Sequence, residues 1–184
     1  MSKIVVIVGS IRRDSINRKL AEALTKLAKP GTQFTFSRID DLPLFSQDLE
    51  PSPPASVTRL KGEIEAADGV LIVTPEYNRS IPGVLKNAID WASRPYGKNS
   101  FDGKPTAAIG TAMGNIGTAA AQQHLRSILA YLNVVLMGQP EGYIVFKQGL
   151  VDDSHVITDE NVRKFLQTYM DKFGAWVERY GQKS

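Results

Sequence analysis

The fold is decided by one stretch of the sequence, Asp68-Gly69-Val70-Leu71-Ile72-Val73-Thr74-Pro75-Glu76-Tyr77-Asn78-Arg79-Ser80-Ile81-Pro82-Gly83. Its first part, 68–74, is a continuous apolar run rich in β-branched residues, which is typical of a strand buried on both faces of a parallel sheet. Pro82 suits the first turn of a following helix, and Ser80 is a candidate N-cap. That helix is predicted to end before Pro95, because a proline disfavours the helical conformation in the residue that precedes it.

Apolar strand patterns alternate with helical patterns along the whole chain. Further strands are predicted at 3–9, 33–39, 105–112, 134–137 and 142–146, and further helices at 17–29, 56–67, 118–132 and 158–180. This alternation indicates an α/β fold with about five parallel strands, helices on both faces and right-handed crossovers. We expect one domain that covers residues 1–184. The proline-rich segment 40–54 is predicted to be a long irregular loop, and loops of that length are often functional.

Composition excludes several classes of function. The 184 residues include no cysteine, so disulfides, thiolate metal sites, cysteine nucleophiles and dithiol redox chemistry are ruled out, and any redox activity must come from a bound cofactor. A net charge of +3 can attract anionic small molecules, but no concentrated basic run points to nucleic acid. Neither a membrane-length apolar run nor a signal-peptide pattern is present, so we expect a cytoplasmic protein with no membrane partner.

The loop between the first strand and the first helix is a candidate phosphate site. Backbone amides and the positive end of the helix dipole meet anions at such a junction. The spacings of the dinucleotide fingerprint and of the P-loop are both absent. The loop instead offers short polar side chains and two arginines, a set suited to one terminal phosphate: Ser10, Ser15, Asn17, Arg12 and Arg13. The alternative interpretation is a capped helix start with two solvated arginines.

No metal site is expected from the remaining polar residues. His124 and His155 lack companions at metal-ligand spacing, and Asp152-Asp153 lack the other ligands of a calcium loop. Trp91 and Trp176 are interpreted as anchors of the core or of an interface rather than as ring-stacking groups.

Two long motifs follow the first and third strands. The first is Gly-Ser-x-Arg-x-x-Ser-x-Asn at 9–17, and the second is Thr-Pro-Glu-Tyr-Asn-x-Ser-x-Pro-Gly-x-Leu-Lys-Asn-Ala-Ile-Asp-Trp at 74–91. Together with Met113-Gly114 and the segment 123–126, they resemble the NADPH-dependent FMN reductase family, and within it the bacterial chromate and quinone reductases. The resemblance spans nearly the whole chain, and the second motif is the more specific of the two.

The resemblance implies a flavodoxin-like fold and a site for FMN. The FMN phosphate would lie in the first loop, the turn after the third strand would border the isoalloxazine ring, and the loop after the fourth strand would close another side. The cofactor-binding residues implied are Ser10, Arg12, Ser15, Asn17, Pro75, Glu76, Tyr77, Asn78, Arg79, Met113 and Gly114.

The family also implies a reaction and an assembly. NADPH or NADH would transfer hydride to the flavin, and a quinone, chromate or a similar acceptor would then occupy the same space. No catalytic side chain is assigned, because the flavin carries the chemistry and the protein supplies position and electrostatics. Glu76 is expected to act through its backbone. A homodimer or homotetramer is the assembly expected from the family.

Two positions depart from the family pattern. Gly117 is followed by Thr118 where relatives often show paired glycines and an arginine, and Arg79 stands where relatives are commonly aromatic or small. These departures affect the shape and charge of the second-substrate pocket and leave the FMN assignment unchanged. Two alternative functions remain open: a flavodoxin-like one-electron carrier, although carriers are usually strongly acidic, and a flavin-free module that binds a phosphorylated ligand.

Overall fold

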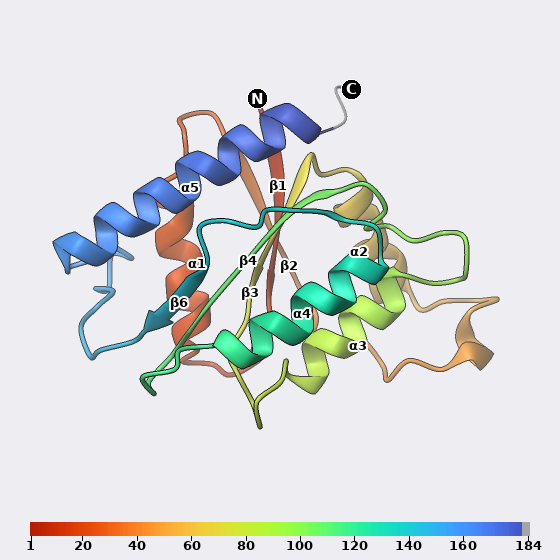
Figure 1. The fold of residues 1–184 in the computed structure, drawn as a ribbon. Helices are drawn as coiled ribbons and strands as arrows, with labels where there is room; N and C mark the ends of the chain where they lie inside the picture. Colours follow the sequence, from red (N-terminus) through yellow and green to blue (C-terminus); the bar gives the residue numbers. More distant parts are fainter. Residues whose placement is uncertain (182–184) are drawn as a thin grey trace.

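Apolar runs in the chain form the strands of one parallel sheet. In the computed structural model, which describes residues 1–181, the sheet has six strands and the order β2-β1-β3-β4-β5, with β6 also paired to β4 (Figure 1). All the pairings are parallel. The bounds are β1 Lys3–Val8, β2 Gln33–Ser37, β3 Gly69–Val73, β4 Pro105–Ala112, β5 Val135–Leu136 and β6 Gly142–Val145. The predicted α/β class with a parallel sheet is therefore confirmed.

The fifth position of the sheet is split between two short strands. β5 pairs with the start of β4, at Pro105 and Thr106, whereas β6 pairs with its end, from Ile109 to Ala112. Pro140 lies between the two strands and has no amide hydrogen to donate to a ladder. β5 and β6 follow each other along the same edge of β4 and together occupy one position in the sheet. The sheet therefore has the expected five positions, although it contains six strands.

The helices cover both faces of the sheet, as Figure 1 shows. α1 and α5 pack on one face around a cluster that includes Leu20, Leu24, Leu166 and Phe173. α2, α3 and α4 pack on the other face. Each fully buried large apolar side chain in these two layers stabilises the fold by ~1.5–3 kcal/mol. The helix bounds are α1 Ile16–Lys26, α2 Ala55–Glu65, α3 Gly83–Ala92, α4 Ala119–Tyr131 and α5 Glu160–Tyr180.

The long connection between β2 and α2 is anchored on α3. It contains one short 3₁₀ helix, Gln47–Leu49, within the segment predicted to be irregular. The Trp91 indole N–H donates to the carbonyl of Pro43 at 2.8 Å, and the Trp91 ring meets the ring of Phe45 edge-on with centroids 5.0 Å apart. Trp91 is 1% exposed, so the structure assigns it to the interior of the chain. None of the helices in the described part is long and apolar enough to cross a membrane.

We predict that Trp91→Phe lowers the free energy of unfolding by ~2 kcal/mol, because it removes the indole hydrogen bond and leaves a void beside the loop. Urea unfolding followed by circular dichroism measures the change. Leu44→Ala, at a side chain of the same connection that is 84% exposed, is the control and should match the unaltered protein. Equal stability of the Trp91 variant and the unaltered protein would contradict the anchoring role.

Candidate functional site

Three loops meet at the carboxyl edge of the sheet, after β1, β3 and β4. The amide of Gly9 donates to the carbonyl of Val73 at 2.9 Å, and the amide of Thr74 donates to the carbonyl of Ile109 at 2.9 Å. These bonds extend the strand pairing into the loops, so the starts of the loops are held side by side. Ligands of open α/β sheets bind in the crevice outside this edge.

The first loop ends in a helix start with free donors. Ser15 is the N-cap of α1, and its hydroxyl oxygen accepts from the amide of Arg18 at 3.3 Å. Within residues 1–181 the amides of Ile16 and Asn17 have no acceptor, and Arg12 is exposed and forms no ion pair. Free amides, the helix dipole and an available guanidinium together suit an anion.

Asn17 connects the first loop to β4. Its side chain is 1% exposed, its Nδ2 donates to the carbonyl of Thr111 at 2.9 Å, and its Oδ1 accepts from the amide of Thr111 at 3.0 Å. One of the two amide hydrogens of Asn17 stays available. The side chain therefore fixes α1 to the edge of the site, and its role toward a phosphate stays a prediction.

The turn after β3 is a tight hairpin built from left-handed residues. Tyr77 and Ser80 exchange two backbone hydrogen bonds, of 3.0 and 2.9 Å, and the φ angles of Asn78 and Arg79 are 51° and 64°. Two successive positive φ values define a type I′ turn, which asparagine tolerates and arginine adopts only at a cost. The hairpin holds the side chain of Tyr77 about half exposed.

Ser80 is not the N-cap of α3, so that prediction was wrong. The N-cap is Pro82, which makes no side-chain cap bond. Ser80 belongs to the hairpin, and its hydroxyl lies 3.0 Å from Nδ1 of His124 on α4. The backbone pairing with Tyr77 explains the difference, because it places Ser80 before the helix turn begins.

Glu76 has a role that its motif did not indicate. Its side chain is 7% exposed, and its Oε2 accepts from the amide of Ala121 at 3.0 Å, in the first turn of α4. Thr118, the N-cap of α4, makes no side-chain cap bond. The other carboxylate oxygen lies 3.1 Å from Nη1 of Arg79. Glu76 thus caps α4 from a different loop, where a carboxylate is favoured by the helix dipole.

Large apolar side chains are exposed on all three loops. Their exposed fractions are 61% for Ile11, 52% for Tyr77, 78% for Met113 and 51% for Ile116. A Cβ added at Gly114 would meet no atom within 4 Å, so space is open beside this loop. Apolar groups around free hydrogen-bond donors are typical of a site for a planar organic ligand with a charged tail. No group of three or more acidic or histidine side chains in residues 1–181 is placed to hold a metal ion.

All the residues that the resemblance assigned to FMN lie on these three loops or at the start of α1. Sequence reasoning missed the capping of α4 by Glu76 and the double bond between Asn17 and Thr111. The poorly capped first turn of α4, Ala119-Ala120-Ala121, was the one available signal that a carboxylate from elsewhere was needed.

Comparison with known proteins gives consistent results over nearly the whole length. The chain is 56% identical over 175 residues to a 2-hydroxy-1,4-benzoquinone reductase of Burkholderia sp, covering 95% of this chain and 96% of the relative. It is 46% identical to a quinone reductase of Pseudomonas putida, with 95% and 94% covered. The structure of FerB, a flavoenzyme NAD(P)H:(acceptor) oxidoreductase of Paracoccus denitrificans, superposes with a TM-score of 0.95 at 48% identity, covering 99% of this chain and all of that one.

The family model described as NADPH-dependent FMN reductase matches residues 2–149, a range that includes all three loops of the site. With the flavodoxin-like arrangement of the sheet and relatives this similar, the chain belongs to the NADPH-dependent FMN reductase family.

Proposed function

We propose that this protein is an FMN-dependent NAD(P)H oxidoreductase that reduces quinones. One observation carries the proposal. A helix start with free amides and loops rimmed by exposed apolar side chains lie together at one edge of the sheet. The activities named for the similar proteins of Burkholderia and Pseudomonas putida support the same reaction. Residues 1–184 would form one FMN-binding domain. The start of α1 and the loops after β3 and β4 all belong to one sheet and its two helical layers.

The donors and apolar groups of the edge fit FMN. Ser10, Arg12, Ser15, Asn17 and the free amides of the α1 start suit its phosphate dianion. The isoalloxazine ring would be flanked by the segment 75–79 and by Met113-Gly114. Apolar side chains would contact its faces, and backbone groups would bond its polar edge.

FMN, when bound, supplies the hydride and electron transfer between a nicotinamide and an acceptor. The chain's own residues position the partners. The hairpin of Tyr77 and Ser80 fixes the loop after β3, and Glu76 ties this loop to α4. The exposed apolar side chains exclude water from the space where donor and acceptor bind in turn. No side chain is required as a general acid or base.

The acceptor class includes oxyanions such as chromate as well as quinones. Arg79 lies at the rim of the site, and 68% of its side chain is exposed. A neutral quinone is favoured by the apolar rim, and an anionic acceptor is attracted by the guanidinium.

We also propose a cytoplasmic location and a homodimer or homotetramer. The groove between the C-terminal halves of α3 and α4 has a volume of about 590 Å³ and offers a surface for a second copy. Its lining includes Tyr96 and Tyr131, which are 87% and 81% exposed. Exposed aromatic side chains of this kind are enriched at protein interfaces.

We expect the FMN-loaded protein to lose its flavin absorbance when NADPH is added without oxygen, and to regain it when a benzoquinone follows. Steady-state rates across a panel of quinones, chromate and free flavin, measured with both nicotinamides, define the acceptor. Flavin absorbance that NADPH and NADH leave unchanged would contradict the proposal and favour a one-electron carrier. A purified protein that cannot be loaded with FMN would favour a flavin-free binding module.

We predict that Arg12→Ala weakens FMN binding about tenfold or more, because it removes a charge-assisted bond to the phosphate. Its thermal stability without FMN should be unchanged, since Arg12 is exposed and forms no ion pair within the described residues. Fluorescence titration of the protein with FMN measures the affinity. Arg13→Ala is the matched control in the same loop, and an equal loss of affinity in both variants would argue against a specific role of Arg12.

We predict that Glu76→Ala costs ~1–2 kcal/mol of stability, because the first turn of α4 loses its cap and Ala121 is left with an unsatisfied amide. For a chain of this size the melting temperature falls by about 2–4 °C for each kcal/mol. Calorimetry on the FMN-free protein measures the shift. Glu160→Ala, at an exposed first-turn carboxylate of α5, should change stability much less. Identical shifts in both variants would contradict the capping role.

A further inference from the structure

A second, smaller cavity opens on the other side of the first loop. It lies between the carboxyl ends of β1 and β2 and has a volume of about 210 Å³. It is separate from the β3 and β4 loops, because β1 stands between β2 and β3 in the sheet. Its lining combines charged side chains with apolar ones, among them Arg12, Arg18, Arg38, Asp40, Ile11 and Phe36.

The lining of this cavity is positively charged, with three arginines against one aspartate. Arg18 is already compensated, because its Nε lies 2.6 Å from Glu22 and its guanidinium lies 4.0 Å from the centre of the Phe36 ring. Arg12 forms no ion pair within the described residues. Arg38 is bonded to Asp40 alone among carboxylates in residues 1–181. Arg12 is therefore the arginine of the lining without a carboxylate partner in the described residues. The Arg38–Asp40 pair is more exposed than the Arg18–Glu22 pair, so Arg38 is the arginine that can exchange its carboxylate for a ligand.

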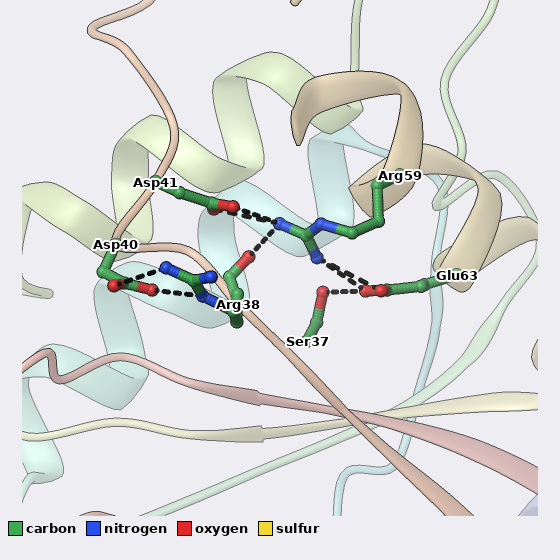
Figure 2. A network of polar contacts seen from close by, with 6 residues as sticks. All are labelled: Ser37, Arg38, Asp40, Asp41, Arg59 and Glu63. Atoms are coloured by element: carbon green, nitrogen blue, oxygen red, sulfur yellow. Dashed lines mark hydrogen bonds and ion pairs between the residues drawn. The ribbon is translucent and has the colours of Figure 1, made fainter. Parts of the chain in front are cut away.

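A network of polar contacts holds the β2 side of the cavity in place. Arg38 donates to the two carboxylate oxygens of Asp40 at 3.2 and 3.1 Å. Figure 2 shows this pair beside the contacts of Arg59. Arg59 of α2 donates to the carbonyl of Arg38 at 3.0 Å and to Asp41 at 2.9 Å. In the same network Arg59 bonds Glu63, which also accepts from the hydroxyl of Ser37 (Figure 2). The backbone that carries Arg38 is thus fixed before any ligand binds, which lowers the entropic cost of binding.

We propose that this cavity binds the adenosine end of NADPH, with Arg38 pairing to its 2′-phosphate and Arg12 adding positive charge at the rim. The inference rests on the proposed function, in which a nicotinamide nucleotide is the electron donor. β2 lies two strand positions from β3, a separation of roughly 10 Å at the usual strand spacing. One end of a dinucleotide can therefore lie over the β3 and β4 loops while its other end reaches β2.

Arg38 and Asp40 together can distinguish NADPH from NADH, because one is a cation and the other an anion. A phosphate monoester carries about −1.5 to −2 charge near neutral pH and accepts paired bonds from a guanidinium. An exposed ion pair contributes little stability, so Arg38 can exchange Asp40 for the phosphate. In NADH the same ribose position carries a hydroxyl, which can donate to the carboxylate of Asp40. The cavity therefore takes both nucleotides and favours NADPH.

The first test is the ratio of kcat/KM for NADPH to kcat/KM for NADH on the FMN-loaded protein. Arg38→Ala should lower this ratio about tenfold, and Asp40→Asn should raise it, because the carboxylate that repels the phosphate becomes neutral. Arg163→Ala, at an exposed arginine of α5, is the control and should leave the ratio within about twofold. A ratio that Arg38→Ala leaves unchanged would overturn the inference.

The second test measures binding without electron transfer. Calorimetry compares adenosine 2′,5′-bisphosphate, adenosine 5′-monophosphate and inorganic phosphate on the FMN-loaded and FMN-free proteins. The bisphosphate should bind most tightly, and Arg38→Ala should weaken it about tenfold. Equal affinity for the bisphosphate and the monophosphate, or for inorganic phosphate, would overturn the assignment of a 2′-phosphate site.

The two tests separate this inference from the proposed function. If NADPH fails to reduce the flavin but the bisphosphate binds in an Arg38-dependent manner, the cavity assignment stands and the reductase proposal fails. If both nicotinamides reduce the flavin but the bisphosphate shows no preference, the reductase proposal stands and the cavity assignment fails.

Discussion

The close approach of β3 and β4 at their carboxyl ends is the constraint on which the site depends. A Cβ added at Gly110 would lie 2.0 Å from the backbone oxygen of Thr74, so only glycine allows the two strands to run this close where the loop after β3 begins. The next residue, Thr111, is bonded through both backbone groups to Asn17. One point in β4 therefore fixes the position of the β3 loop and of the α1 start. The relative positions of the three loops therefore follow from the packing of the sheet, while the hairpin bonds between Tyr77 and Ser80 shape the loop after β3 itself.

The loop after β3 is held in an unfavourable backbone conformation by bonds within it and by one bond to α4. Two left-handed residues in succession, one of them Arg79, cost energy that a flexible loop would avoid. The buried carboxylate of Glu76 offsets this cost by capping α4 and by pairing with Arg79. The residues of the motif at 74–80 thus have a structural role. They form a hairpin and attach it to α4. A planar ligand would bind to a surface that is already formed. Such a preformed surface suits a protein that orients its ligands and supplies no acid or base.

The sequence was most informative where the signal is local. The uninterrupted apolar runs at β1, β3 and β4 identified buried strands, and the periodicity of α5 identified a helix whose N-cap is Asp159. The sequence was least informative where a contact joins distant positions. Ser80 looked like an N-cap in isolation, but its pairing with Tyr77 placed it in a hairpin. The capping of α4 by Glu76 joins residues 45 positions apart, and no pattern within either segment specifies it. The split of the fifth strand position likewise depends on which part of β4 each short strand meets.

Arg12 lies in both of the regions that we propose to bind anions, because it belongs to the loop after β1 and also lines the cavity beside β2. Its single guanidinium cannot give its full set of bonds to two phosphates at once. A cofactor phosphate that draws Arg12 inward leaves Arg38 as the main cation of the cavity, and Arg38 is held by the network on α2 rather than by the first loop. Recognition of the nucleotide thus depends on a part of the molecule that the cofactor does not touch. Such a division allows the affinity for the electron donor to change through residues of β2 while the binding of the cofactor stays the same.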